Sequence, residues 1–403
     1  MTKIDYTPPH GLRVLMKAFA DTGHQIRIVG GAVRDLLLGQ EPKDVDLCTT
    51  ATPEEMIALG KAYGFTVIPT GLQHGTVTFV MRYSLVETEC ATGVVETYEV
   101  TTLRIDVDTD GRHAEVMFTK SFEEDAARRD LTINAMSMDQ NGNIYDYFGG
   151  IKDLETEVIR FVGDASERIQ EDYLRILRAY RFAARFGCFI DPMNDKRAIR
   201  ANVAGLAQIS KERVWSEISK ILTTPETPYS RRRWYTVAEM IKDGVFAAVG
   251  LPIDPRASVC TPMLNRMERA DDAVSAISAF LTHDRALSFS AEWRMSFAER
   301  EKLWWLTGTD LNREVSLHAV EDMLVIGRPR NWVVSWCKMN GDNRLTYHAE
   351  TWEIPTFPVR GQDLLDAGMK QGKEMGDRLA AMRKRWMQSR FVETTEELMN
   401  AVH

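Results

Sequence analysis

The stretch "GGAVRDLLLGQEPKDVDL", residues 30–47, decides the fold of the N-terminal part of this chain. The β-branched run "IRIV" just before it predicts a strand, and "AVRDLLLG" predicts a helix that ends at Gly39. Gly30 and Gly31 lie at the turn between the two, where backbone N–H groups can approach a bound anion closely. Such a turn suits a triphosphate, although a Gly-Gly turn is also common as plain chain reversal.

Two aspartates close the same stretch. In "KDVDL", Asp44 and Asp46 are two residues apart, so on a strand both would project from one face while Val45 points into the core. Carboxylates at that spacing repel each other, and a bound divalent cation relieves the repulsion. An isolated pair also fits a solvated strand edge. Its combination with the glycine turn favours a magnesium site.

The whole-chain composition limits the function classes. The chain has 403 residues, is 44% hydrophobic and carries a net charge of -8, so it is long enough for several domains and must hold any polyanion through local basic patches. Its five cysteines are scattered without a CxxC pair, which argues against disulfides and thiolate zinc sites. No signal peptide or bilayer-spanning run is evident, so we expect a cytoplasmic protein without membrane association.

Secondary-structure patterns change along the chain. Short β-branched runs such as "GFTVIP", "GTVTFVMR" and "VVETYEVTTLR" predict strands within residues 1–147. From about Leu154 the spacing of apolar residues is helical almost to the end, and Gly187 predicts the end of the helical run "ASERIQEDYLRILRAYRFAARFG". We therefore expect an α/β head followed by an all-helical remainder.

Two further groups of polar residues carry chemistry. "RRDLTIN" places Arg129, Asp130 and Asn134 within reach of phosphates and ribose hydroxyls if the segment is helical, although a solvated charged face is the commoner outcome. Asp172 and Arg175 are three residues apart and would be neighbours on one helix face. They form either a plain ion pair or a reader of the amino group and acceptors of cytosine and adenine, which uracil and guanine would mismatch.

Several of these segments together resemble one family. "GGAVRDLLLG…DVDL", "TTLR…DGRHAEV", "RRDLTINAM", "YDYFGGIKDL", "RIQEDYLRILRAYRFAARF" and "ISKERVWSEISKIL" follow the order and spacing of the class II tRNA nucleotidyltransferases, the CCA-adding enzymes, from about Ile26 to Leu222. The resemblance implies an α+β fold. Its parts would be a DNA polymerase β-like head with a mixed sheet (1–150), then a helical neck (151–224), body (225–350) and tRNA-binding tail (351–403).

The resemblance also implies an activity and roles for residues. The enzyme would add C, C and A to the 3′ end of tRNA from CTP and ATP with two Mg²⁺ ions. Asp44 and Asp46 would bind the metals, and the nucleotide would be bound by Gly30, Gly31, Arg34, Arg129, Asp130, Asn134, Glu171, Asp172, Arg175 and Arg178. Within the last group, Asp172 and Arg175 would select the base, with Glu171 orienting Arg175.

Three further assignments complete the expected site. We expect Glu99 to be a third acidic group near the metals. The loop containing Arg104, Asp110 and Arg112 would be the flexible element needed to change from C to A addition. The basic tail segment 370–390, including Arg383, Lys384 and Arg385, would contact the phosphates of tRNA, although it is also compatible with a solvated helix face.

Four alternatives remain at this point. A bacterial poly(A) polymerase and an enzyme that adds only A share the head and neck. A catalytically inactive RNA-binding module would have no use for the Asp44–Asp46 and Asp172–Arg175 pairs. A hydrolase of the His-Asp type would use His283 and Asp284, but no second metal-spaced cluster accompanies them. The oligomeric state is not indicated by the sequence.

Overall fold

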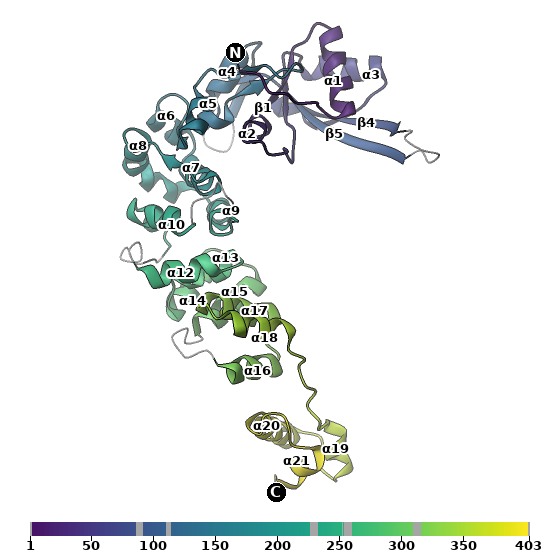
Figure 1. The fold of residues 1–403 in the computed structure, drawn as a ribbon, viewed down its shortest axis with the longest axis vertical. Coiled ribbons are helices and arrows are strands. Elements are labelled where there is room, and N and C mark those ends of the chain that lie inside the picture. The colour runs from purple at the N-terminus through teal and green to yellow at the C-terminus, as the bar shows by residue number, and fades with distance from the viewer. Residues whose placement is uncertain are drawn as a thin grey trace. The chain divides into compact units, whose positions relative to one another are not determined.

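The computed structural model describes residues 2–85, 92–109, 114–225, 233–251, 253, 260–308 and 316–401. The chain divides into two compact units, which we describe separately (Figure 1). The first comprises Met1–Leu264 with Ala291–Arg294, and the second comprises Asn265–Ser290 with Met295–His403. No helix among these residues is long and apolar enough to cross a membrane.

A seven-stranded mixed sheet forms the head of the first unit. Its strand order is β3-β4-β5-β2-β1-β8-β9. The β2–β5 pair is parallel, and the other neighbouring pairs are antiparallel. The strands are β1 (Ile26–Val29), β2 (Leu47–Thr49), β3 (Thr66–Gly71), β4 (Thr76–Leu85), β5 (Thr92–Thr102), β8 (Ser137–Met138) and β9 (Ile144–Tyr145). A separate hairpin pairs β6 (Arg104–Thr109) with β7 (Ala114–Phe118). The expected α+β fold with a mixed sheet is confirmed.

The two faces of this sheet differ in what covers them. Helices α1 (His10–Asp21) and α3 (Pro53–Tyr63) cover one face, where Leu47, Phe79 and Val100 are buried in the main hydrophobic core (Figure 1). Because side chains alternate along a strand, Cys48, Glu99 and Thr101 belong to the opposite face. That opposite face carries the candidate site.

The turn after β1 has the geometry that the sequence predicted. Helix α2 (Gly31–Leu37) follows directly, and Gly39 with a φ of 68° stands just beyond its end. Gly30 has a φ of 69°, a backbone conformation that strongly favours glycine, and a Cβ there would lie 3.0 Å from Nη1 of Arg129. The glycine thus allows the close approach of an arginine from a distant segment.

Three local predictions were wrong. Asp44 and Asp46 precede β2 instead of lying within it, because the strand begins at Leu47, although the carbonyl of Asp46 accepts a hydrogen bond from the Val29 N–H (3.0 Å). Helix α4 (Phe122–Ala127) ends before Arg129 and Asp130, and Asn134 ends a short 3₁₀ helix that begins at Thr132. The helical run after residue 164 is broken at Asp172.

This break separates α6 (Ala165–Glu171) from α7 (Leu174–Phe186). Asp172 has an extended backbone with φ −153° and ψ 104°, and its carboxylate accepts a hydrogen bond from the Leu174 N–H (3.1 Å) at the start of α7. Helix α7 ends at the left-handed Gly187, as expected. Two parallel two-residue strands, β10 (Val158–Ile159) and β11 (Phe189–Ile190), also interrupt the helical region.

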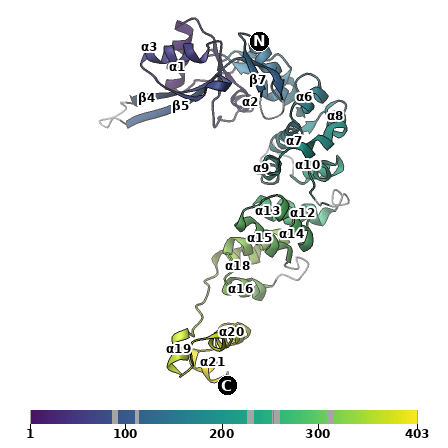
Figure 2. The ribbon, with the colours of Figure 1, turned by 180° about the vertical axis from the view of Figure 1, so that it is seen from behind.

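The remaining helices of the first unit include α9 and α10, which lie beside α7 in both views (Figures 1 and 2). They are α5 (Gly150–Glu155), α8 (Asp195–Asn202), α9 (Lys211–Leu222), α10 (Arg233–Lys242) and α11 (Val245–Ala248), together with the first four residues of α12 (Thr261–Arg269), whose remainder belongs to the second unit. Asp243, just after α10, has a fully buried side chain that binds Lys196, the Tyr180 hydroxyl (2.5 Å) and Arg200 (2.8 Å). This carboxylate fastens α7, α8 and α10 together.

The regular secondary structure among the described residues of the second unit is entirely helical. One hydrophobic cluster includes Trp336 and Leu345, and another includes Trp386 and Leu398. The helices are α13 (Ala273–Ser278), α14 (His283–Glu292), α15 (Phe297–Gly308), α16 (Leu317–Val325), α17 (Arg330–Asn340), α18 (Asn343–Thr351), α19 (Gly361–Asp366), α20 (Lys373–Gln388) and α21 (Thr395–Ala401). The expectation that residues 225–350 are helical is met where they are described.

Asp243→Asn is expected to destabilise the first unit. Burial opposes ionisation, but the bonds from Lys196, Tyr180 and Arg200 hold the pKa of Asp243 below its usual value. Removing the charge should cost about 3 kcal/mol in free energy of unfolding and lower the Tm measured by calorimetry. Because the pKa of Asp243 is lowered in the folded protein, its stabilisation is complete above the ordinary Asp pKa of about 4 and is lost as the pH falls from there through the folded-state pKa. The difference in Tm between the variant and the unmodified chain should therefore shrink below about pH 4.

The control is Asp21→Asn, which removes an exposed ion pair with Lys17 on α1. An exposed pair contributes less than about 1 kcal/mol, so this variant should melt close to the unmodified chain. Equal melting temperatures for the two variants would contradict the role assigned to Asp243.

Candidate functional site

A cleft of about 1350 Å³ opens on the first unit between the head and the helices that follow it. The turn before α2, the segment 40–46, the segment after α4, and helices α7 and α9 all line it. Twelve of the residues predicted from sequence are among its lining: Gly30, Gly31, Arg34, Asp44, Asp46, Arg104, Arg129, Asp130, Asn134, Asp172, Arg175 and Arg178. Residues from distant segments therefore meet at one cavity.

The cleft is strongly basic although the chain is acidic. Eleven Lys and Arg residues line it against five Asp, while the whole chain has a net charge of -8. The lining cations are Arg34, Lys43, Arg104, Arg128, Arg129, Arg175, Arg178, Arg181, Arg185, Arg213 and Lys220. Converging cations in a concave site raise the local concentration of an anionic ligand. The cleft is suited to a polyanion.

Arg34 is held rigidly near the glycine turn. Its guanidinium donates to Asp35 (2.7 Å) and to the side-chain oxygen of Asn134 (2.5 Å), and it lies 5.1 Å and 4.7 Å from the ring centroids of Phe182 and Phe186. Burial lowers the pKa of Arg34, and the neighbouring Asp35 opposes that effect. A guanidinium remains charged under these conditions, so a fixed cation faces the cleft.

The acidic pair has the character of a cation site. Asp44 and Asp46 are both exposed on the cleft wall, and Val45 between them packs against the core, as the alternation predicted. Within the described part of the chain, neither carboxylate has a hydrogen-bond or ion-pair partner. Partial burial and the charge of Asp44 raise the pKa of Asp46, while Arg129 lowers it. Unshared carboxylate oxygens are the ligands that Mg²⁺ prefers.

Glu99 lies on the same sheet face as the acidic pair. Leu47 pairs with Val100 in parallel strands, so continuing the register by one residue would bring Asp46 next to Glu99, although Glu99 is not among the residues that line the cleft. No group of three or more His, Cys, Asp or Glu side chains is placed to hold a metal among residues that the structure describes. Glu99 as a third ligand stays a prediction.

Asp125 organises the two arginines after α4. Its buried carboxylate accepts from Arg128 (3.0 Å) and Arg129 (3.1 Å), and Arg129 also approaches the Cys48 sulfur (3.6 Å). Burial opposes ionisation of Asp125, but the two guanidinium groups hold its pKa below the usual value. Burial and the charge of Asp125 raise the pKa of the Cys48 thiol to about 12. Cys48 therefore stays protonated and neutral at the site.

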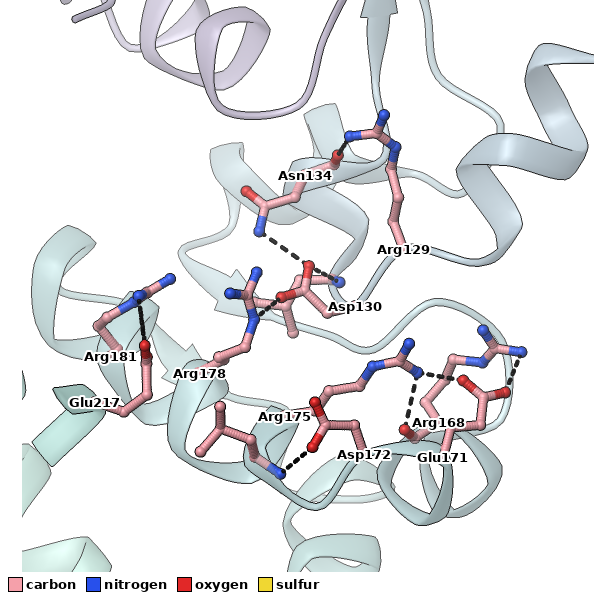
Figure 3. A network of polar contacts seen from close by, with 12 residues as sticks. Arg129, Asp130, Asn134, Arg168, Glu171, Asp172, Arg175, Arg178, Arg181 and Glu217 are labelled. Atoms are coloured by element: carbon pink, nitrogen blue, oxygen red, sulfur yellow. Dashed lines mark hydrogen bonds and ion pairs between the residues drawn. The ribbon is translucent and has the colours of Figure 1, made fainter. Parts of the chain in front are cut away.

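Asp130 is the centre of a polar network that joins the head to α7 (Figure 3). Its carboxylate accepts from the Leu131 N–H (2.8 Å), the Asn134 amide (3.2 Å) and the Arg178 guanidinium (2.6 Å). Burial opposes ionisation, yet Arg178 holds the pKa of Asp130 below its usual value. The network therefore fixes the Asp130 carboxylate and the Asn134 amide at the cleft.

Asp172 and Arg175 do not pair with each other's side chains, as a plain ion pair would require. The Asp172 carboxylate binds Arg213 (2.8 Å) from α9. Arg175 instead pairs with Glu171 and donates to the backbone carbonyl of Arg168 (2.9 Å), as Figure 3 shows, and it also donates to the carbonyl of Arg128 (3.3 Å). Each group is oriented by its own partner. Both line the cleft, so they present an acceptor and a donor to it.

Several lining residues were missed in the sequence reasoning. Arg181 and Arg185 continue the spacing of Arg175 and Arg178 along α7, so the helical period of that run was a usable signal. Phe182 and Phe186 stack at 6.0 Å with an interplanar angle of 4°. Arg213 and Lys220 reach the cleft from α9, and no local pattern reveals a contact between helices.

Some predicted residues lie elsewhere. Glu171 does not line the cleft, and its carboxylate forms an ion pair with the Arg175 guanidinium. Asp110 and Arg112 fall outside the described residues, and Arg104 begins strand β6 instead of lying in a loop.

The remaining predictions concern the second unit. The tail residues Arg383, Lys384 and Arg385 are exposed on α20, where Arg385 binds Glu393 (2.8 Å). His283, at the start of α14, contacts the Thr307 hydroxyl (3.3 Å). No metal cluster accompanies His283 in the part of the chain that is described.

Comparison with known proteins gives consistent results. Residues 26–160 match the family model described as the poly A polymerase head domain, and residues 195–249 match a probable RNA and SrmB-binding site of polymerase A. The CCA tRNA nucleotidyltransferase 1, mitochondrial, of Danio rerio is 37% identical over 408 residues, which cover 97% of this chain and 90% of that protein.

Two bacterial proteins are also similar. The CCA-adding enzyme of Geobacillus thermodenitrificans is 44% identical over 205 residues, covering 50% of this chain and 46% of that protein. The crystal structure of the Bacillus stearothermophilus CCA-adding enzyme in complex with CTP aligns over 98% of each chain, with a TM-score of 0.71 and 26% identity. The similarity therefore includes the helical region as well as the head.

The electrostatic coupling of the acidic pair can be measured directly. We expect Asp44→Asn to lower the pKa of Asp46 in metal-free protein, because it removes the repulsion that raises it, and Arg129→Gln to raise that pKa further. NMR titration of ¹³Cγ-labelled aspartates reports the midpoint. Asp21→Asn on the exposed face of α1 serves as the control and should leave it unchanged. An Asp46 midpoint that does not move in Asp44→Asn would refute the coupling.

Proposed function

The chain belongs to the CCA tRNA nucleotidyltransferase family, the CCA-adding enzymes, and from this membership we propose how its cleft extends the 3′ end of a tRNA. It is a nucleotidyltransferase that adds C, C and A from CTP and ATP without a nucleic-acid template. The observation that carries the proposal is the single cleft lined by both the Asp44–Asp46 pair and the Asp172–Arg175 pair. One pair serves the chemistry, and the other selects the nucleotide.

The reaction is a displacement at phosphorus. The 3′-hydroxyl oxygen of the RNA bonds to the α-phosphorus of CTP or ATP, the bond from that phosphorus to the oxygen bridging to the β-phosphate breaks, and pyrophosphate leaves. The hydroxyl proton passes to solvent. The chain contributes mainly by positioning the two substrates and by stabilising charge.

Asp44 and Asp46 would hold two Mg²⁺ ions. Two such ions lower the pKa of an attacking hydroxyl and stabilise charge on a leaving oxygen. The carboxylates fit that task because both lie on the cleft wall and neither accepts a hydrogen bond from another described side chain. Burial and, to a smaller extent, the charge of Asp44 raise the pKa of Asp46, and a bound cation would relieve the repulsion between the two carboxylates.

The triphosphate and ribose would lie along the basic wall. Gly30 and Gly31 give backbone access to phosphate oxygens, and Arg34 and Arg129 supply charge. The Asp130–Asn134 pair, tied to Arg178, offers an acceptor and an amide to the ribose hydroxyls. Every group in this set is held by a partner before the nucleotide arrives, which reduces the entropy lost on binding.

Base selection would rest on Asp172 and Arg175. The carboxylate accepts from the exocyclic amino group of cytosine or adenine, and the guanidinium donates to the adjoining acceptors. Arg213 orients the carboxylate (2.8 Å), and Glu171 orients the guanidinium. Uracil and guanine would present donors to donors and leave buried groups unpaired, which discriminates strongly.

The wider assignments follow the family. We propose residues 1–150 as the catalytic head, 151–224 as the neck, 225–350 as the body and 351–403 as the tail. The basic surface of α20 would contact tRNA, and the segment that contains Arg104, Asp110 and Arg112 would act in the change from C to A addition. A cytoplasmic location stays a prediction, since the name of the Danio rerio relative assigns that protein to mitochondria.

The decisive test is product length. The protein should be given tRNA lacking CCA, tRNA ending in C and tRNA ending in CC, with CTP and ATP separately and together. Addition of two C residues with CTP alone, and completion to CCA with both, is the expected result. Runs of A on every substrate would indicate a poly(A) polymerase, and addition only to tRNA ending in CC would indicate an A-adding enzyme.

Asp44→Ala and Asp46→Ala are each expected to reduce incorporation of both CMP and AMP by at least ~100-fold, because the charge stabilisation at the reacting phosphate is lost. Binding of tRNA should stay near normal, since the cations that contact phosphates are untouched. A Mg²⁺-dependent incorporation assay and a filter-binding assay measure the two effects. Substantial turnover by either variant would refute the metal assignment.

Arg175→Ala is expected to reduce the preference for CTP over UTP by ~10-fold or more, since a charged hydrogen-bond donor is removed from the base. Binding of tRNA should change less. Competition between CTP and UTP measures the preference, and Arg13→Ala on the exposed face of α1 is the control. If Arg175→Ala discriminates as well as the unmodified chain, the templating role is wrong.

A further inference from the structure

A second cavity, of about 420 Å³, opens on the site face of the sheet. It shares Asp46, Arg104, Arg128 and Arg129 with the large cleft, so the two are continuous around the Asp46 carboxylate. The other residues that line the second cavity have no part in the roles proposed for the large cleft. Its volume is in the range in which proteins bind small molecules.

The floor of this second cavity is a cross-strand row of the sheet. Thr76 of β4 pairs with Thr101 of β5, which pairs in turn with Cys48 of β2. The Thr76 and Thr101 hydroxyls are 2.9 Å apart and hydrogen-bonded to each other. One oxygen of such a pair keeps a lone pair for a ligand, and the other can donate to it by rotating its hydrogen. The floor is suited to another hydroxyl group.

The walls of the second cavity are cationic. Arg104 at the start of β6 donates to the carbonyl of His74 (2.5 Å), which fixes the guanidinium over the threonine row. Arg128 is fixed by Asp125 (2.9 Å), and the same carboxylate accepts from the Arg104 N–H (3.4 Å). A guanidinium has five donors, so one held in this way can still bind a phosphate. Two oriented arginines beside a hydroxyl row match a ribose-phosphate.

The reaction also needs a site for the RNA end close to Asp46. In displacement at phosphorus, the attacking and leaving oxygens are roughly in line. The groups assigned to the triphosphate, ribose and base line the large cleft, and of them only Arg129 also lines the second cavity. The second cavity also borders Asp46, and Thr76, Thr101, Arg104 and Arg128 in its lining have no role toward the incoming nucleotide, so they are available to the RNA end.

We propose that the second cavity binds the 3′-terminal nucleotide of the RNA that is being extended. Arg104 and Arg128 contact the phosphodiester on its 5′ side, and the Thr76–Thr101 hydroxyl pair contacts its ribose 2′-hydroxyl. This places the terminal 3′-hydroxyl at Asp46. The inference rests on the proposed function and adds to it the acceptor half of the site.

The chemistry of the lining explains how one cavity can serve successive additions. The terminal base of the RNA changes as nucleotides are added, whereas its ribose and phosphate remain the same. Guanidinium and hydroxyl groups recognise those constant parts, and the 2′-hydroxyl distinguishes RNA from DNA. Base selection stays with Asp172 and Arg175 in the other half of the site.

A chemical double-mutant cycle tests the phosphate contact. The substrates are tRNA ending in CC and the same tRNA with its last phosphodiester replaced by a neutral methylphosphonate. With the unmodified protein, the methylphosphonate should raise KM for tRNA ~10-fold. Arg104→Gln should raise KM for the normal tRNA by a similar factor, leave KM for ATP unchanged, and show no further loss with the methylphosphonate.

Arg82→Gln is the matched control, since Arg82 is exposed on β4 outside both cavities. It should retain the full methylphosphonate penalty. If Arg104→Gln also retains that penalty, or if it raises KM for ATP instead, the inference is overturned. Failure of the unmodified protein to extend any tRNA would instead overturn the proposed function, so the two failures are distinguishable.

A second variant covers the case in which Arg104→Gln does not fold. Thr101→Val keeps the shape of the residue and removes its hydroxyl. It should raise KM for tRNA several-fold, and a 2′-deoxy residue at the RNA terminus should add no further loss in that variant. Additive losses would overturn the ribose contact, and Thr97→Val on the exposed face of β5 is the control.

Discussion

The ion pair between Asp130 and Arg178 (2.6 Å) is the contact on which the site depends. Asp130 comes from the head and Arg178 from α7, and the carboxylate is nearly buried. A buried charge without a partner costs several kcal/mol, so the pair fixes where α7 lies against the head. Arg168 and Arg175 reinforce this position by donating to the carbonyls of Ala127 and Arg128. The acidic pair and the base-selecting residues face one cleft as a result.

The concentration of positive charge in the cleft is possible because acidic residues around it bind the cations. Asp35, Asp125, Glu171 and Glu217 each pair with at least one lining arginine, and Glu217 pairs with both Arg181 and Lys220. These pairs offset the repulsion among the cations and fix their orientation. A polyanionic nucleotide then meets dipoles and charges that need little rearrangement, which is the condition for electrostatic catalysis.

The differences between sequence expectation and structure share one cause. The apolar spacing from Ile169 to Phe186 is helical, and it does not register the extended residue Asp172 that separates α6 from α7. That break lets the Asp172 carboxylate reach Arg213 on α9 while Arg175 turns back to Glu171. Likewise, Asp44 and Asp46 stand before β2 because the pairing of β1 with β2 begins at Leu47. The spacing of apolar residues shows which face of a segment is buried. It gives no sign of a local break in a helix or strand when residues far away along the chain stabilise that break.

The sequence by itself determined the element types of the head, the glycine turn, the acidic pair and the residues of α7 that carry charge. These are local properties, since strand and helix spacing, the backbone freedom of Gly30 and the order of motifs are written in adjacent residues. Only the tertiary structure decided that Arg213 supports Asp172, that Asp125 orients Arg128 and Arg129, and that Thr76, Thr101 and Arg104 form a second cavity at Asp46. Such contacts join residues far apart along the chain, and they exist only because strand register and helix packing bring their side chains within hydrogen-bonding distance.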